Sequence, residues 1–335
     1  MDTSWNTRLL FKAKSRASFC SQDLVGVQKK IDLEDKLKPD PESVQGILEI
    51  ALKRFQPINC PSVFISSRTD KGVHGLENAA HVDFEHPQGD SPSWPEFMIH
   101  GLNRYFCKAH ADLRIKNILP VPDTFHSRFN AKSRTYLYRI AVQKSSWSQD
   151  FSHEYNIKIP MGEWKRCCMI GDPNFDIDKV KEAASYFVGL KDFLTFTGRG
   201  NKLPEGYSTV RRINSLTISP GQPLINSIYD PTNHMYDFWD VVVNAKSFNY
   251  RQVRRMVAVL IAVAQNKIEV TEVKNMIEDP SNYGWNPKAC TAPPYGLYLL
   301  KVEYDPKDLI FSSQSADNIN LDMEGNSEIG ATSGA

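Results

Sequence analysis

Long apolar runs are missing from this sequence. No stretch approaches the ~20 consecutive apolar residues that span a membrane, and no secretory signal pattern stands at the start. Collagen-like composition, sustained heptads and a short internal repeat are missing as well, while 41% of the residues are hydrophobic. We therefore expect a globular protein without a membrane span, with about two domains for its 335 residues.

Cysteines are few, and their spacing fits no metal site. No CxxC pair occurs, and two of the six cysteines are adjacent, which is poor geometry for one closed site: Cys20, Cys60, Cys107, Cys167, Cys168 and Cys290. Free thiols in a reducing compartment are expected. Nucleotide-binding and metal-binding motifs are also missing, so we expect neither a cofactor nor a metal.

An excess of charge of one sign is lacking too, because the net charge is only +1. Its distribution is uneven. Residues 307–335 contain one lysine and five acidic residues, a net of −4, so residues 1–306 carry +5. This pattern predicts one basic face on the folded part and a disordered acidic, polar tail over residues 307–335.

The first residues are basic and free of acids. Residues 3–22 contain Arg8, Lys12, Lys14 and Arg16, no acidic residue, and frequent serine. This composition is typical of a mitochondrial transit peptide, although a frayed basic terminus has the same composition. We treat residues 1–42 as an atypical segment and mitochondrial location as an expectation.

Apolar periodicity predicts helices and strands in mixed order. A helix begins at the N-cap residue Ser43, and further helices are predicted at 94–106, 176–193, 251–267 and 270–279. Strand patterns occur at 62–67, 78–85, 112–122, 136–142, 211–221, 236–248 and 296–304. Because the order is not strict βαβ alternation, the pattern favours an α+β fold with helices packed on antiparallel sheets. Residues 43–125 and 126–306 are the expected domains.

The first segment whose side chains could take part in a reaction is the loop Arg68-Thr69-Asp70. A carboxylate lies two residues from a guanidinium, and Gly72 and Gly75 allow a sharp bend. By itself this tripeptide is weak evidence for a site, because in most loops it is an Asx-turn with a surface arginine.

Two further segments combine basic and aromatic residues. Residues 126–144 hold five basic residues and no acid, with Phe129, Tyr136 and Tyr138 interleaved. Such residues hold phosphates and stack on unpaired bases, although a strand with core-facing tyrosines gives the same pattern. In the second segment, Lys246-Ser247-Phe248 precedes a long apolar helix whose first turns carry arginines. Solvated arginines beside a core helix are the alternative there.

Four motifs follow one another between residues 62 and 304. They are SSRTDKGVHG (66–75), FHSRFNAKSRTYLYRI (125–140), SFNYRQVRRMVAVLIAVA (247–264) and APPYGLYLLKVEY (292–304). In type and order they resemble the TruA family of tRNA pseudouridine synthases and, within it, the animal tRNA pseudouridine synthase-like 1 group. The resemblance implies two α+β domains with mainly antiparallel sheets flanked by helices and a basic cleft between them.

The resemblance also implies roles for single residues. Asp70 matches the catalytic aspartate, Arg68 the loop arginine that helps to open the RNA stack, and Tyr136 the tyrosine that stacks on the target base. Arg254 matches the arginine paired with the catalytic carboxylate, and Leu297 an apolar residue of the same pocket. Phosphate contacts are predicted for Lys71, Arg128, Lys132, Arg134, Arg251 and Arg255. His74 belongs to the loop motif and is assigned a structural role.

The sequence departs from the family pattern at two places. Lys71 stands where alanine is usual, next to Asp70. The residues RLLFKAKSRASF (8–19) replace the expected first strand, and only VGVQKK (25–30) resembles the turn that follows it. We therefore expect the first strand of the N-terminal sheet to be altered and stability or activity to be reduced.

The expected function is the isomerisation of uridine to pseudouridine in tRNA or another structured RNA, by a homodimer as in the family. An RNA-binding protein that no longer catalyses is the first alternative, since the departure at the N-terminus favours it. A hydrolase with Asp70 and a second carboxylate is another, but Asp83 and Glu85 are better interpreted as strand residues.

Overall fold

The structure is a computed structural model that describes residues 5–15, 41, 43–87, 94–145, 159–198 and 203–311. Its strands are β1 (Trp5–Ser15), β2 (Phe64–Ile65), β3 (His74–His86), β4 (Leu113–Val121), β5 (Ser133–Gln143), β6 (Cys168–Ile170), β7 (Gly189–Asp192), β8 (Val210–Pro220), β9 (Tyr236–Ala245) and β10 (Leu297–Glu303). Its α-helices are α1 (Val44–Lys53), α2 (Trp94–Lys108), α3 (Ile177–Ser185), α4 (Gln252–Ala264) and α5 (Val270–Glu278).

Within the described residues, the strands form one ten-stranded sheet. Its order is β4-β1-β3-β10-β5-β9-β8-β7, with β2 added to β3 and β6 added to β5. Most pairs are antiparallel, whereas β3–β10 and β5–β6 are parallel. The predicted α+β class is confirmed, but the sheets of the two halves are joined and not separate.

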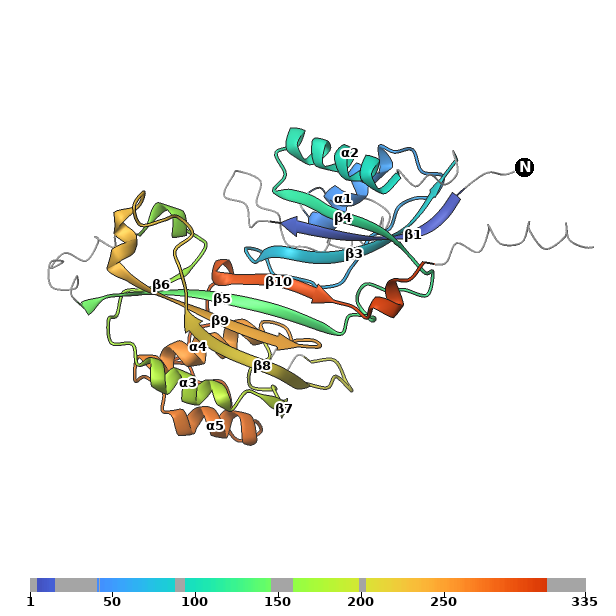
Figure 1. Cartoon of the computed structure of the whole chain (residues 1–335). Helices are drawn as coiled ribbons and strands as arrows, with labels where there is room; N and C mark the ends of the chain where they lie inside the picture. The colour runs from blue at the N-terminus through green and yellow to red at the C-terminus, as the bar shows by residue number, and fades with distance from the viewer. Residues whose placement is uncertain are drawn as a thin grey trace, which may run out of the picture.

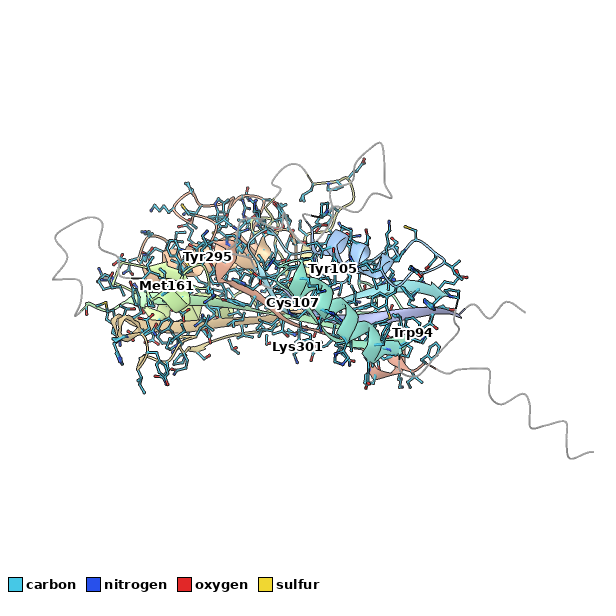
Figure 2. All side chains as sticks on the ribbon, turned by 90° about the horizontal axis from the view of Figure 1, so that it is seen from above. Trp94, Tyr105, Cys107, Met161, Tyr295 and Lys301 are labelled. Carbon is cyan, nitrogen blue, oxygen red and sulfur yellow. The ribbon has the colours of Figure 1, made fainter. Side chains whose placement is uncertain are left out.

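The helices fall into two groups, one for each half of the sheet. Figure 1 shows α1 and α2 beside the β4-β1-β3 half and α3, α4 and α5 beside the β5-β9-β8 half. Seen from above, the molecule is elongated, with Trp94 of α2 near one end and Met161 near the other (Figure 2). Each half therefore builds its own hydrophobic core, and the sheet connects them.

The core of the first half lies between its helices and its sheet. The predicted cap is present, since Ser43 Oγ accepts a hydrogen bond from Gly46 N at 3.0 Å. Leu48 and Leu52 of α1 and Leu102 of α2 are buried with apolar residues of β1, β3 and β4. This packing fixes the sheet from which the Asp70 loop extends.

β1 corrects the expectation of an altered first strand. Trp5–Ser15 pairs antiparallel with both β3 and β4, so it is an interior strand. Leu9 and Phe11 pack into the core of the first half, while Leu10 packs into the larger core on the other side. An interior strand covered on both faces carries a continuous apolar run and does not alternate, which is why its sequence resembles no half-exposed strand.

The same strand changes the interpretation of residues 3–22. Arg8 pairs with Asp83 at 2.6 Å, and Lys12 lies 3.7 Å from Glu77. Two of the basic residues taken as transit-peptide signals therefore make ion pairs within the sheet. Residues 16–40, with the family-like stretch 25–30, lie outside the described residues.

The core of the second half is built around α4. This helix is buried on almost every side, as its nearly uninterrupted apolar sequence predicts. α3 ends at Ser185, earlier than the predicted 193, and Gly189 adopts φ +98° at the start of β7. The left-handed φ of Gly189 ends the helical pattern and turns the chain into the edge strand.

The chain after β10 stays attached to the fold for several residues. Pro306–Leu309 form a short 3₁₀ helix, and Asp308 accepts a hydrogen bond from Asn130 Nδ2 at 3.1 Å. Residues 307–309 of the predicted disordered tail therefore belong to this helix, and residues 312–335 lie outside the described residues. No helix among the described residues is both long and apolar enough to cross a membrane.

Candidate active site

The loop that carries Asp70 connects β2 to β3. The amide of Val73 donates to the carbonyl of Asp70 at 3.1 Å, which closes a tight turn. Gly72 within it adopts φ +86°, and a Cβ there would lie 3.0 Å from Pro294 Cγ. Both the positive φ and the close contact require glycine. The loop is thus pressed against the segment that leads into β10.

Asp70 forms an ion pair with Arg254 from the start of α4. Asp70 Oδ2 lies 2.8 Å from Arg254 Nη1, and the two side chains are 26% and 11% exposed. Arg254 Nε also donates to the carbonyl of Ala292 at 2.8 Å, which holds the guanidinium plane in place. Among the described residues, Arg254 alone bonds to this carboxylate, so Oδ1 is left for a reacting group.

The pair lines a cavity of about 610 Å³ between the two halves of the sheet. Asp70 is the only acidic residue among the described residues that line it. Six basic residues line it as well: Arg68, Arg128, Arg134, Lys246, Arg251 and Arg254. A concave site with this charge attracts polyanions, and phosphates above all.

Rings and an apolar side chain form the inner wall of the cavity. Tyr136 of β5 is buried and meets the ring of Phe248 edge to face, with 5.3 Å between the ring centroids. Burial raises the pKa of Tyr136 to about 12, so its hydroxyl stays protonated at neutral pH. Leu297 pairs with Tyr138 across β10 and β5 and also lines the cavity. A flat ring, an apolar wall and one carboxylate together suit a planar heterocycle.

The structure brings together the four predicted residues Asp70, Tyr136, Arg254 and Leu297, with Arg68 exposed at the same cavity.

The six predicted RNA contacts divide into groups. Arg128 and Arg251 are exposed and line the cavity, and Lys71 is exposed in the loop that carries Asp70. Lys132 pairs with Asp305 at 2.5 Å outside the cavity lining.

Arg134 and Arg255 take roles that differ from the prediction. The guanidinium of Arg134 is buried and donates to several oxygens of the protein, among them Ser66 O at 3.1 Å and Lys246 O at 2.5 Å. Arg255 donates to Thr195 O and Thr197 O at 3.0 and 2.7 Å. Both guanidinium groups hold backbone segments around the cavity through these hydrogen bonds, and phosphate contacts by the two residues stay a prediction.

Two other residues of the motifs are structural, as their patterns allowed. Tyr138 is fully buried and donates to the carbonyl of Pro293 at 2.8 Å, so it is the core tyrosine of the pair. His74 stacks on Tyr298, with 4.5 Å between the ring centroids, and its Nε2 lies 3.1 Å from Tyr295 O. His74 therefore fixes β3 to β10 next to the loop that carries Asp70.

Sequence reasoning missed Tyr207 and Asn249. Tyr207 comes from the loop before β8 and lines the cavity, with its Oη 3.1 Å from Asn249 Oδ1. Asn249 is buried and donates to Thr209 O at 2.8 Å. The PEGY turn before β8 was the only local signal, and a turn by itself says nothing about which cavity it reaches.

Comparison with known proteins decides the family. The chain is 36% identical to tRNA pseudouridine synthase-like 1 of Mus musculus over 267 residues, which is 80% of this chain and 86% of that protein. Residues 183–305 match the family model described as tRNA pseudouridine synthase. This chain belongs to the tRNA pseudouridine synthase family. Its relatives also include the Xenopus laevis protein of the same name, 33% identical over 79% of this chain and 84% of that protein.

Bacterial members of the family are similar as well. The tRNA pseudouridine synthase A of Ehrlichia chaffeensis is 28% identical over 80% of this chain and 93% of its own length. A tRNA pseudouridine synthase is an isomerase, so the chain belongs to a family of enzymes. Among the described residues, no cluster of three His, Cys, Asp or Glu side chains is arranged as metal ligands. The five cysteines within the described residues carry free thiols.

Proposed function

We propose that this tRNA pseudouridine synthase family member converts uridine to pseudouridine in tRNA, with Asp70 as its catalytic carboxylate. The observation that carries the proposal is the Asp70–Arg254 pair, 2.8 Å long, in a cavity lined by six basic residues and no second acid. The names of its relatives support tRNA as the substrate.

The chemistry requires one acidic group and retention of the base. The bond from N1 of uracil to C1′ of ribose breaks, the base turns, and a bond from C5 to C1′ forms; C5 then loses its proton and N1 takes one up. No atom or electron is gained overall, so no external oxidant or reductant takes part. A carboxylate can serve such a reaction as nucleophile or as base. Asp70 Oδ1, which the ion pair leaves available, is the oxygen that we assign to this step.

The target base has to leave its stack to reach Asp70. Extrusion of a base costs a few kcal/mol. Stacking on an aromatic ring returns roughly 1–3 kcal/mol, and we assign this contact to Tyr136. Arg68, exposed in the loop two residues before Asp70, would take the place that the base leaves. The neutral Tyr136 hydroxyl keeps a second charge away from the carboxylate.

The two alternatives make different demands on the cavity. A hydrolase with paired carboxylates needs a second acid near Asp70, and no other acidic residue among the described residues lines the cavity. An RNA-binding protein without turnover needs only the basic residues. The intact strand β1 removes the structural reason for expecting impaired activity.

Pseudouridine mapping of unmodified tRNA transcripts tests the proposal. After incubation with the parent protein, carbodiimide treatment and reverse transcription should give new stops, whereas Asp70→Asn, which has nearly the same shape, should give none. Asp178→Asn, at an exposed position of α3, is the matched control and should behave as the parent. Stops from Asp70→Asn would show that Asp70 is not catalytic. Salt-sensitive tRNA binding by the parent without stops would favour the RNA-binding alternative.

We further propose that the protein acts as a homodimer, as its resemblance to the family implies. Exposed apolar side chains gather at the end that holds Met161, on the segments 161–164 and 224–229. Apolar surface of this kind is typical of interaction sites. Light scattering of the purified full chain tests the proposal, and a monomer at micromolar concentration would contradict it.

The composition of residues 3–22 supports mitochondrial residence, which we also propose. Because Trp5–Ser15 is an interior strand, the proposal requires that the mature protein retains it. N-terminal sequencing of protein recovered from isolated mitochondria tests both points. A mature N-terminus after residue 15, or absence from mitochondria, would contradict them.

A further inference from the structure

Three exposed aromatic rings lie at the cavity, each with an arginine over its face. We call them the rim pairs, with distances from guanidinium carbon to ring centroid of 5.7 Å in Arg128–Phe129, 5.5 Å in Arg211–Tyr207 and 4.9 Å in Arg251–Tyr250. All three rings line the cavity that contains Asp70. The pairs come from three different segments of the chain, so their common arrangement is a property of the fold.

The rings are too exposed to be explained by core packing. Phe129 is 71% exposed, Tyr207 41% and Tyr250 39%. Phe129 contacts the ring of His126, with 4.3 Å between the centroids, and still keeps most of its surface exposed. An apolar ring held in water at the mouth of a basic cavity indicates a ligand that covers it.

Tyr207 is held in position before any ligand binds. Its hydroxyl oxygen lies 3.1 Å from Asn249 Oδ1 and accepts from Arg211 Nη2 at 3.1 Å. Asn249 is 4% exposed, and its Nδ2 donates to Thr209 O. The same buried amide precedes Tyr250 in the chain, so two of the rim pairs share one anchor. A ring fixed in this way loses little conformational entropy when a flat ligand stacks on it.

The third rim pair is held beside these two by a buried arginine. Arg134 Nη2 donates to Arg128 O at 2.9 Å, while its Nη1 donates to Lys246 O at 2.5 Å. The segments that carry Phe129 and Tyr250 are therefore joined through one guanidinium. The rim pairs thus form one continuous surface next to Asp70.

We infer that the rim pairs bind unpaired nucleotides on either side of the target uridine, a conclusion that rests on the proposed function. Each ring offers a stacking face for a base, and each arginine offers donors for a phosphate. Bases inside an intact duplex are already stacked and cannot reach these faces. The substrate class is therefore a uridine in a loop or another locally unpaired segment, with unpaired neighbours.

Binding of short RNA to the full chain tests the inference. The probe is a single-stranded RNA hexamer with 2-aminopurine beside a central uridine, and Asp70→Asn is the background so that no turnover occurs. Phe129→Leu, Tyr207→Leu and Tyr250→Leu keep an apolar side chain but remove the stacking face. Each should weaken binding about tenfold and reduce the quenching of 2-aminopurine fluorescence. Phe97→Leu, at a 60% exposed ring of α2 that does not line the cavity, is the matched control and should change neither.

Further variants and a duplex probe complete the test. Phe129→Trp, Tyr207→Phe and Tyr250→Phe keep the rings and should retain quenching, which separates lost stacking from lost folding. Unchanged affinity in the leucine variants would overturn the inference, as would a duplex of the same sequence that binds as tightly as the hexamer. A parent that binds and quenches the hexamer but forms no pseudouridine in tRNA would refute the proposed function alone. If the parent forms pseudouridine and the leucine variants bind the hexamer as tightly as the parent, the inference about the rim pairs is wrong but the proposed function stands.

Discussion

Asp70 and Arg254 are 184 residues apart in the chain and 2.8 Å apart in the fold. Each side chain of the pair stabilises the other. Arg254 compensates a partly buried carboxylate, and Asp70 holds the arginine that also ties the carbonyl of Ala292. Removal of either side chain leaves the other charge without its partner in a site shielded from solvent.

Arg254→Ala should therefore reduce both stability and turnover. We expect the free energy of unfolding to fall by about 2 kcal/mol, the typical value for a lost hydrogen bond to a charged group, and pseudouridine formation to drop more than about tenfold. Urea unfolding and single-turnover rates measure the two effects. Arg212→Ala, an exposed arginine of β8, is the control and should change neither. A variant as stable and as active as the parent would show that the ion pair is dispensable.

The residue types of the site could be predicted from sequence, but their burial could not. Motif order placed Asp70, Tyr136 and Arg254 in one pocket, and the structure brings them together. Arg134 and Arg255 were predicted as phosphate ligands because the sequence of a basic segment does not distinguish an arginine that faces solvent from one that bonds to backbone carbonyl oxygens. Only the fold shows that these two donate to the protein's own oxygens.

At the scale of the element, the fold of the first half depends most on the strand β1. Without it, β3 would become an exposed edge, and β4, which already lies at the edge of the sheet, would lose the strand that it pairs with; three successive buried apolar residues would be lost as well. Exposed edge strands template aggregation. The strand is therefore required for the half of the protein that holds the Asp70 loop.

A chain that begins at residue 16 should not fold into a soluble protein. The missing strand removes Leu9, Leu10 and Phe11 from two cores, and burial of each such side chain stabilises by about 1.5–3 kcal/mol. Expression, sedimentation and circular dichroism of this truncation measure the outcome. A chain that ends at residue 311 is the control and should remain soluble. A soluble, active protein without residues 1–15 would contradict the role given to β1.

Most elements followed from apolar periodicity, and the exceptions have physical causes. The α1 cap, α4 and β5 lie where their patterns predict. β1 was missed because an interior strand buried on both faces does not alternate. The predicted α3 extends too far because β7 carries helix-compatible residues, whereas the helix ends at Ser185 and Gly189, with its positive φ, begins the strand.

At the scale of the whole molecule, two histidines near β3 make stability depend on pH. Burial lowers the pKa of His81 to about 4, and Nδ1 of its ring accepts a hydrogen bond from Ser127 N at 3.2 Å. Burial lowers the pKa of His126 as well. Protonation of His81 would charge a buried ring and remove an acceptor, so the folded state favours the neutral form.

Acidification from pH 7 to 5 should therefore destabilise the protein. In the unfolded chain the pKa of His81 is about 6.5, whereas in the folded protein it is about 4. The unfolded chain therefore binds more protons between these two values, and stability is lost as the pH falls through this window. The expected contribution of His81 is about 2 kcal/mol between pH 7 and 5. Urea unfolding at both pH values measures it. His81→Gln should reduce the difference, whereas His234→Gln, at an exposed histidine, should leave it unchanged.

β10 lies in the middle of the sheet, between β3 and β5, although it follows all the other described strands in the chain. A ribosome therefore has to reach Glu303 before β10 can join the two halves of the sheet. Until Leu297–Glu303 emerges, nothing in the sheet connects the Asp70 loop to the half that supplies Arg254. A nascent or prematurely terminated chain thus exposes two unpaired strand edges, and catalysis begins only after synthesis has reached the end of the fold.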